Sequence, residues 1–122
     1  MPTYEDIFAM NPQDLVTWLH EEFYVELPSK IENTDDMANA SELMLQLTGQ
    51  YSYLAELLSY AKIAVRKAKR ALPKEEWEDM VDRKEAIERR LDIAKQEYTA
   101  VSRAITVKTE AHKELMMGGG MV

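Results

Sequence analysis

The sequence contains no cysteine, and it is poor in glycine and proline, with four of each among 122 residues. Without cysteine the chain has no disulfide scaffold, no thiolate zinc site and no cysteine nucleophile. Glycine and proline are the residues that most often interrupt helices, and three of the four glycines stand together at 118–120. The composition therefore favours an all-α protein.

Long apolar runs are missing as well. No stretch approaches the eighteen apolar residues that a membrane-spanning helix needs, so we expect no contact with a membrane. The first residues do not form a basic segment followed by an apolar run. We therefore expect no signal peptide and a cytoplasmic location.

Motifs that support catalysis or metal binding are also missing. The two histidines, His20 and His112, have no second ligand at a recognised metal-binding spacing. No serine lies in a Gly-x-Ser-x-Gly elbow, and no glycine-rich loop follows a strand to hold a phosphate. We predict a non-enzymatic protein that uses no metal and no cofactor.

The dominant positive feature is an apolar spacing that alternates between three and four residues. It extends over residues 37–72, stops at Pro73, and resumes over residues 77–115. Such seams are typical of long helices that pack side by side. The spacing predicts one long helix at 33–72 and another at 73–116.

Only a short, proline-containing break separates the two long helices, which favours a tight turn and an antiparallel, coiled-coil-like hairpin. The alternative is a single kinked helix whose packing partners come from other chains. Upstream, Asn11 and Pro12 match the cap and first position of a shorter helix in the 3–32 segment. We therefore predict one helical domain at 1–117, with short N-terminal helices packed on the hairpin, and a flexible tail at 118–122.

Three polar residues occupy seam positions at which the repeat expects apolar side chains: Lys84, Lys108 and His112. A polar residue in a seam can fix register and oligomeric state, and Lys84 could pair with an acid on a neighbouring helix. The alternative is that lysine stems near helix ends extend past the seam to water. The sequence leaves both interpretations open.

Apolar residues beside the seams form a second set that a two-helix hairpin cannot fully bury. Ile93, Ala100 and Val107 recur every seven residues on one helix, so they share a face. Together with Leu43 and Leu57 they form the predicted apolar stripe. Because contiguous apolar patches are unusual on monomers, this stripe predicts a homo-oligomer or a helical protein partner.

The net charge of −7 is distributed unevenly. Residues 1–60 hold eleven acids and one base, whereas residues 61–122 hold fourteen bases and eleven acids. This asymmetry allows one end to meet a basic partner and the other an anionic partner. The alternative is that the two halves attract each other, within one molecule or between copies.

A run of cations closes the first long helix and is the best candidate for a functional site. This basic patch comprises Lys62, Arg66, Lys67, Lys69, Arg70 and Lys74. Such a patch can contact the phosphates of a nucleic acid, and single-stranded DNA is the expected form. The alternative is a solvated helix end whose positive charges stabilise the negative end of the helix dipole.

Two segments resemble small helical proteins encoded by bacteriophages and prophages. They read SELMLQLTGQYSYLAELLSYAKIAVRKAKR, from Ser41, and MVDRKEAIERRLDIAKQEYTAVSRAITVKTEAHKEL, from Met80. The plan is similar to that of the phage recombination mediator proteins. The resemblance covers residues 35–115 through the helix layout, the tyrosines and bases of the first long helix, and Ser102-Arg103. It implies a small all-α oligomer that helps to load a recombinase onto single-stranded DNA in a bacterial host cell.

The resemblance implies an accessory protein that acts through helical protein–protein contacts in DNA recombination or replication. A phage-type protein with an acidic N-terminal part suggests a second function, that of an anti-CRISPR-like or other inhibitor of a host defence complex. Its acids would imitate nucleic acid against a basic channel. This acidic surface comprises Asp14, Glu21, Glu22, Glu26, Glu32, Asp35 and Asp36. A third alternative is a structural, oligomeric adaptor.

Overall fold

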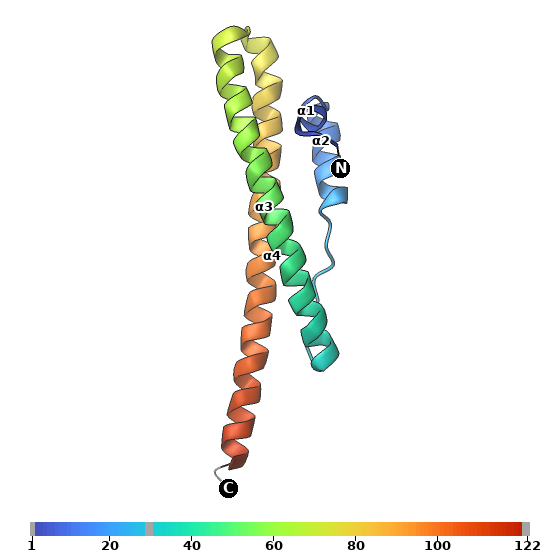
Figure 1. Ribbon diagram of the computed structural model, residues 1–122, viewed down its shortest axis with the longest axis vertical. Helices are drawn as coiled ribbons and strands as arrows, with labels where there is room; N and C mark the ends of the chain where they lie inside the picture. The colour runs from blue at the N-terminus through green and yellow to red at the C-terminus, as the bar shows by residue number, and fades with distance from the viewer. Residues whose placement is uncertain (1, 29–30, 121–122) are drawn as a thin grey trace.

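The chain forms four α-helices and, within the described residues, no strand. A computed structural model describes residues 2–28 and 31–120, with side chains up to Ala111. The helices are α1 (Tyr4–Phe8), α2 (Pro12–Glu22), α3 (Thr34–Ala71) and α4 (Lys74–Gly120). Figure 1 shows α3 and α4 as a long rod, with α1 and α2 beside the half of the rod nearest the turn. The predicted all-α fold is confirmed.

Both short helices begin at a side-chain cap, and the cap of α2 is the one that its sequence predicts. The Thr3 hydroxyl accepts a hydrogen bond from the Asp6 backbone N–H at 3.1 Å, and the Asp6 carboxylate accepts one from Thr3. This reciprocal pair is a capping box. The Asn11 side chain accepts from the Gln13 N–H at 2.9 Å, and Pro12 occupies the first position of α2. The caps satisfy N–H groups that the helices leave free.

The long helices are joined by a break of two residues. Leu72 has an extended backbone, with φ −120° and ψ 152°, because the residue before a proline avoids the helical region. The 38 residues of α3 span about 57 Å and the 47 residues of α4 about 70 Å. Helix α4 continues to Gly120, so its predicted end at Met116 is four residues too early. The predicted tail at 118–122 is helical over its first three residues.

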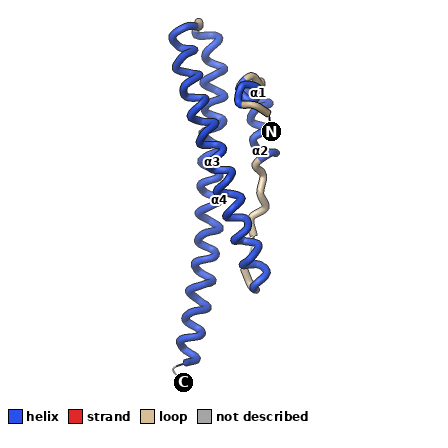
Figure 2. The backbone as a smooth tube through the Cα atoms, in the orientation of Figure 1, coloured by secondary structure: helices blue, strands red, loops and turns tan. Residues whose placement is uncertain are grey.

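The hairpin is antiparallel, and two contacts across it fix the register. The Lys69 ammonium lies 5.1 Å from the centre of the Trp77 ring, and the Lys95 ammonium lies 5.8 Å from the centre of the Tyr51 ring. The two residue numbers add up to 146 in both pairs, so the register is constant over this length. Figure 2 shows the two helices running back along each other. The hairpin is therefore confirmed over the single kinked helix.

A main core lies where all four helices meet. It buries Ile7, Phe8, Leu15, Leu19 and Phe23 from the N-terminal part, Leu54, Leu57, Leu58, Ala61 and Val65 from α3, and Ala86, Ile87, Leu91 and Ala94 from α4. A smaller core lies further from the turn and buries only Ala40, Leu47 and Val101. Apolar burial is therefore concentrated in one half of the rod. No helix in the described part of the chain is long and apolar enough to cross a membrane.

Two arginines of α4 attach the N-terminal segment to the hairpin, and sequence reasoning did not identify them. The Arg83 guanidinium donates a hydrogen bond to the Met10 carbonyl at 2.6 Å. Arg90 donates to the Phe23 carbonyl and forms an ion pair with Glu97 at 3.0 Å. Since these arginines are seven residues apart, they lie on one face of α4 and bind the chain just after α1 and at the end of α2.

The short helices cover one flank of the hairpin, which we call the covered flank. Tyr53 and Tyr60 of α3 lie on this flank. Their ring centres lie 5.6–6.0 Å from those of Tyr4, Phe8 and Phe23. On α4 it includes Arg83, Ala86 and Arg90. The opposite side is the open flank, which includes Tyr51, Lys62 and Lys69 of α3 and Trp77, Lys95 and Tyr98 of α4.

This packing corrects the predicted apolar stripe. Leu57 is fully buried in the main core, because α1 and α2 cover the side of α3 on which it lies. Leu43 is half-buried and packs against the smaller core. Only Ile93, Ala100 and Val107 remain exposed. The exposed part of the stripe is therefore confined to α4.

Candidate nucleic-acid interface

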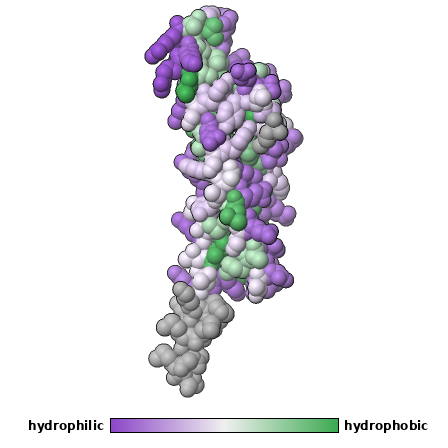
Figure 3. Space-filling model, in the orientation of Figure 1, coloured by the Kyte–Doolittle hydropathy of each residue, from purple (hydrophilic) through white to green (hydrophobic). Residues whose placement is uncertain are grey.

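The basic patch lies at the turn of the hairpin. Five of its cations stand on the last three turns of α3, and Lys74 is the first residue of α4. All six are exposed, and Figure 3 shows hydrophilic side chains projecting around this end of the rod. The hairpin brings Lys74 beside the others, so the patch predicted from the sequence is a real cluster of positive charge.

The patch is divided between two sides of the hairpin. Lys67 continues the seven-residue row of Tyr53 and Tyr60, so it lies on the covered flank. Lys62, Arg66 and Lys69 are spaced four and three residues apart and share the open flank. The predicted six-cation patch is thus a set of three on the open flank with the others around it.

Most of these cations are available to a ligand. Lys74 pairs with Glu78 at 3.7 Å on its own helix, and Lys69 lies over the Trp77 ring. Within the described part of the chain, Lys62, Arg66 and Arg70 form no ion pair. An exposed ion pair such as Lys74–Glu78 contributes little to the free energy of folding, so Lys74 can also exchange Glu78 for a phosphate.

Acids at the start of α4 are divided between the two flanks. Glu76 lies seven and Asp79 four residues before Arg83, which places them on the covered flank with it. Glu78 lies in the seven-residue row of Thr99, at the edge of the open flank, and pairs with Lys74. Glu88 belongs to the open flank and is paired with Lys84 at 3.7 Å. The acid partner of Lys84 at its seam position therefore lies on its own helix, and not on a neighbouring helix.

A second cation–aromatic contact lies further along the open flank. Thr48, Tyr51, Lys95, Tyr98 and Thr99 line a hollow of about 410 Å³ on the hairpin surface. Both tyrosines occupy seam positions, where the repeat predicts burial, yet Tyr51 is 38% and Tyr98 39% exposed. The hollow therefore offers aromatic surface, two hydroxyls and a cation at one place.

The hollow and the basic patch are continuous along α3. Thr48, Ala55, Lys62 and Lys69 follow one another every seven residues, so a single row joins them. Ser52, Ser59 and Arg66 form the adjacent row. Neither row contains an acid, and the two cation–aromatic contacts lie about 27 Å apart along α3 at 1.5 Å per residue. The open flank is thus an extended surface of cations, hydroxyls and aromatic rings.

Sequence reasoning found the basic patch but not the hollow. Tyr51 and Tyr98 fit the apolar seam, so the repeat assigned them to the core, and Lys95 looked like an ordinary exposed lysine. The available signal was the constant register of the hairpin, which places Lys95 level with Tyr51.

The predicted acidic surface is distributed over three elements. Asp14, Glu21 and Glu22 are exposed on α2, whereas Glu26 and Glu32 lie on the connection to α3 and Asp35 and Asp36 in its first turn. Asp36 has a structural role, because its carboxylate accepts a hydrogen bond from the Glu32 N–H at 2.9 Å and its own N–H donates to Asn33.

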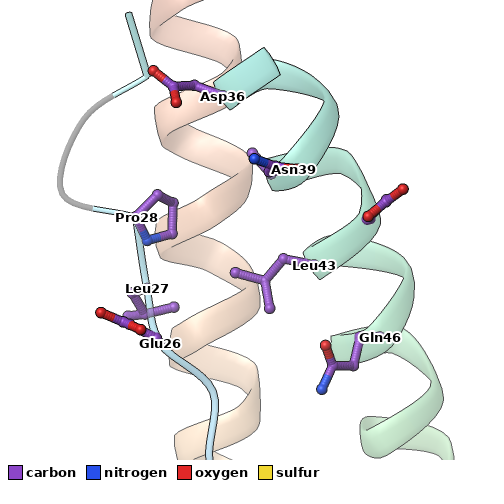
Figure 4. A pocket seen from close by; sticks show the side chains of 9 residues that line it. Glu26, Leu27, Pro28, Asp36, Asn39, Leu43 and Gln46 are labelled. Atoms are coloured by element: carbon purple, nitrogen blue, oxygen red, sulfur yellow. The ribbon is translucent and has the colours of Figure 1, made fainter.

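An acidic groove lies between the connection and the start of α3. Glu26, Leu27 and Pro28 form one wall, and α3 contributes the other, including Asp36 and Leu43, around a volume of about 620 Å³. In Figure 4 the Leu43 side chain points from α3 toward the connection. Only two of the seven predicted acids, Glu26 and Asp36, line this groove, so it does not unite the predicted acidic surface.

The remaining polar candidates give no metal or catalytic centre in the described part of the chain. No group of three or more His, Asp or Glu side chains there could hold a metal ion. Lys108 is half-buried and lines two shallow hollows, and the side chain of His112 lies outside the described residues.

Comparison of the chain with protein-family models, curated proteins and solved structures finds no match. The resemblance to phage recombination mediators therefore stays a prediction.

Proposed function

We propose that the protein is a non-enzymatic accessory protein that binds single-stranded nucleic acid along the open flank of its hairpin. One observation carries the proposal: two cation–aromatic contacts, Lys69 with Trp77 and Lys95 with Tyr51, stand on one flank, whose two rows on α3 contain no acid. A single strand presents phosphates and unstacked bases, and proteins bind these with cations and aromatic rings.

The two parts of the flank have different tasks. Lys62, Arg66 and Lys69 neutralise phosphates, which makes binding dependent on salt and independent of sequence. Tyr51 and Tyr98 stack on bases, and each such stack contributes about 1–3 kcal/mol. A duplex keeps its bases stacked on one another, so the tyrosines favour the single strand. Recombination or replication in a phage-infected cell is the process to which the resemblance assigns this activity.

The proposal is tested by fluorescence anisotropy with a labelled oligothymidine strand at several salt concentrations. Replacement of Lys62, Arg66 and Lys69 by alanine should lower the affinity and reduce the slope of log affinity against log salt by about 2, because three phosphate contacts are lost. The matched control is Lys67→Ala, which removes an exposed cation from the covered flank and should change the affinity little.

The aromatic contribution is measured separately. The double variant Tyr51→Ala/Tyr98→Ala should bind at least about tenfold more weakly with an unchanged salt slope. Tyr24→Ala is the control, because Tyr24 is 63% exposed outside the flank. Circular dichroism confirms that each variant is folded. Absence of binding at low salt, or equal weakening by the control variants, would refute the proposal.

A further inference from the structure

The exposed face of α4 carries a row of apolar residues that no described part of the chain buries. Ile93 is 47% and Val107 65% exposed, and Ala100 between them is exposed too. Ala86 begins the same seven-residue row but is buried in the main core, because α2 packs on α4 there. The row is uncovered as soon as α4 extends past α2.

A hollow beside this row has the residue spacing of a coiled-coil packing site. It has a volume of about 340 Å³ and is lined by Lys95, Gln96, Thr99, Ala100 and Arg103. The last four of these residues have the spacing i, i+3, i+4, i+7, which is that of the hole that receives a side chain from a facing helix. A second hollow, of about 410 Å³, lies between the end of the row and the connection before α3, because Ile31 and Glu32 line it together with Arg103, Ala104, Val107, Lys108 and Ala111.

The apolar row is symmetric about its middle residue. Ile93 and Val107 each lie seven residues from Ala100, so an antiparallel copy of α4 would place Ile93 against Val107 of the second copy. Ala100 would then lie against Ala100, where the small side chains allow the helices to approach closely. Such a contact uses the same patch on both molecules, as two-fold dimers do.

The charges beside the row distinguish the two orientations. Arg89, Gln96, Arg103 and Glu110 form the neighbouring seven-residue row. In an antiparallel pair Arg89 of each copy faces Glu110 of the other, so two pairs of opposite charge form, and the neutral Gln96 faces Arg103. In a parallel pair this row would face the row on the other side of the partner's apolar face, which holds Arg90, Glu97, Ala104 and Ala111. Arg90 and Glu97 are already paired with each other, so this orientation offers Arg89 and Glu110 no such partner. Charge pairs of this kind set helix orientation in coiled coils.

We infer that this α4 face binds a second copy of the chain in antiparallel orientation, with a two-fold axis at Ala100. Arg89 is free to take part, because its side chain is 75% exposed and its contact with Glu85 is long, at 3.8 Å. The apolar row lies outside the open flank, and the hollow beside the row shares Lys95 and Thr99 with the hollow at Tyr51 and Tyr98. The two hairpin turns then lie at opposite ends, about 80 Å apart at 1.5 Å per residue.

Sedimentation over a range of protein concentrations tests the association. The native chain should sediment as a dimer that dissociates on dilution, whereas Ala100→Arg should remain a monomer. The matched control is Ile63→Arg, since Ile63 is 51% exposed on α3 outside the face, and it should dimerise as the native chain does. A native chain that is monomeric at every concentration would overturn the inference.

A charge exchange tests the pairing of Arg89 with Glu110. Each single variant, Arg89→Glu or Glu110→Arg, should raise the dissociation constant about tenfold, because it opposes like charges twice. The double variant should restore the native constant. Additive weakening in the double variant would rule out the proposed register.

The absence of native cysteine allows the orientation to be tested directly. Chains carrying Ile93→Cys and chains carrying Val107→Cys, mixed and treated with a short thiol crosslinker, should give a crosslinked dimer of one chain with the other. Either variant alone should give little product, and Ile63→Cys serves as the control. Self-crosslinking of each variant alone would indicate a parallel pair and contradict the inference.

Discussion

At the scale of single residues, two tyrosine hydroxyls lie in contrasting surroundings. The Tyr4 hydroxyl donates a hydrogen bond to the Glu56 carboxylate at 3.1 Å. The Tyr53 hydroxyl is buried and, among the described residues, has no hydrogen-bond partner. Burial raises the pKa of both phenols, helped by the hydrogen bond to Glu56 for Tyr4 and by the charge of Glu22 for Tyr53. The main core therefore keeps both tyrosines protonated.

We predict that Tyr53→Phe stabilises the protein by about 1 kcal/mol, because it removes a buried hydroxyl that forms no hydrogen bond. The variant should also resist alkali better. The pKa of Tyr53 is higher in the folded than in the unfolded chain, so the protonated phenol favours the folded state. This stabilisation is fully present below the unfolded pKa of about 10, and it is lost as the pH rises through the folded pKa. Urea unfolding at neutral and at alkaline pH measures both effects.

Tyr24→Phe is the control for this substitution, because the exposed Tyr24 has no buried hydroxyl to remove. Its free energy of unfolding should match that of the native chain at both pH values. A loss of stability in Tyr53→Phe at neutral pH would mean that the hydroxyl forms a favourable hydrogen bond in solution.

At the scale of elements, the attachment of α2 to the hairpin depends on a buried arginine. Arg90→Ala would leave Glu97, only 14% exposed at its side chain, without its cation, and the Phe23 carbonyl without its donor. Removal of one partner of a buried ion pair typically costs about 3–5 kcal/mol. We expect Arg90→Ala to lower the free energy of unfolding by an amount near the lower end of this range, as measured by urea unfolding. Hydrogen exchange at the end of α2 should become faster.

The exposed Arg66 provides the matched control, and Arg66→Ala should change the free energy of unfolding by less than about 0.5 kcal/mol. A second variant separates the effect of the unpaired charge from the effect of the lost side-chain packing at Arg90. Replacing Arg90 and Glu97 together by apolar residues of similar size should recover much of the lost stability, because neither charge is then left unpaired. Equal effects of Arg90→Ala and Arg66→Ala would contradict the assigned role.

At the scale of the whole molecule, stability should be graded along the rod. The main core joins all four helices near residues 54–65 and 86–94, whereas the smaller core has three buried residues. Regions with few buried apolar contacts open with lower free energy. We predict that hydrogen exchange is slowest at 54–65 and 86–94, and clearly faster at 34–47 and 101–111. Uniform protection along α3 and α4 would contradict this prediction.

This measurement should be made at two protein concentrations. If α4 pairs with a second copy, its exposed face at residues 93–107 is covered at high concentration only, so exchange there should slow as the concentration rises. Residues 54–65 should not respond. The concentration dependence thus separates the stability of one chain from that of the dimer.

The helices, their approximate ends and the antiparallel hairpin follow from the amino-acid sequence alone. The alternation of three and four residues and the break before Pro73 are local properties of the chain, and helical geometry converts them directly into a packed seam. The sequence also identified the basic patch, because charges close together on one helix remain close together in the fold.

Which surfaces remain exposed depends on how the four helices pack together. Leu57 and Ile93 both lie beside a seam, but α1 and α2 bury the first, while the second stays exposed beyond them. Likewise Tyr51 belongs to the seam yet lies in a surface hollow with Lys95, and Arg90 is buried although it is charged. Helical periodicity assigns each residue to a face of its own helix, whereas burial depends on which other elements pack against that face.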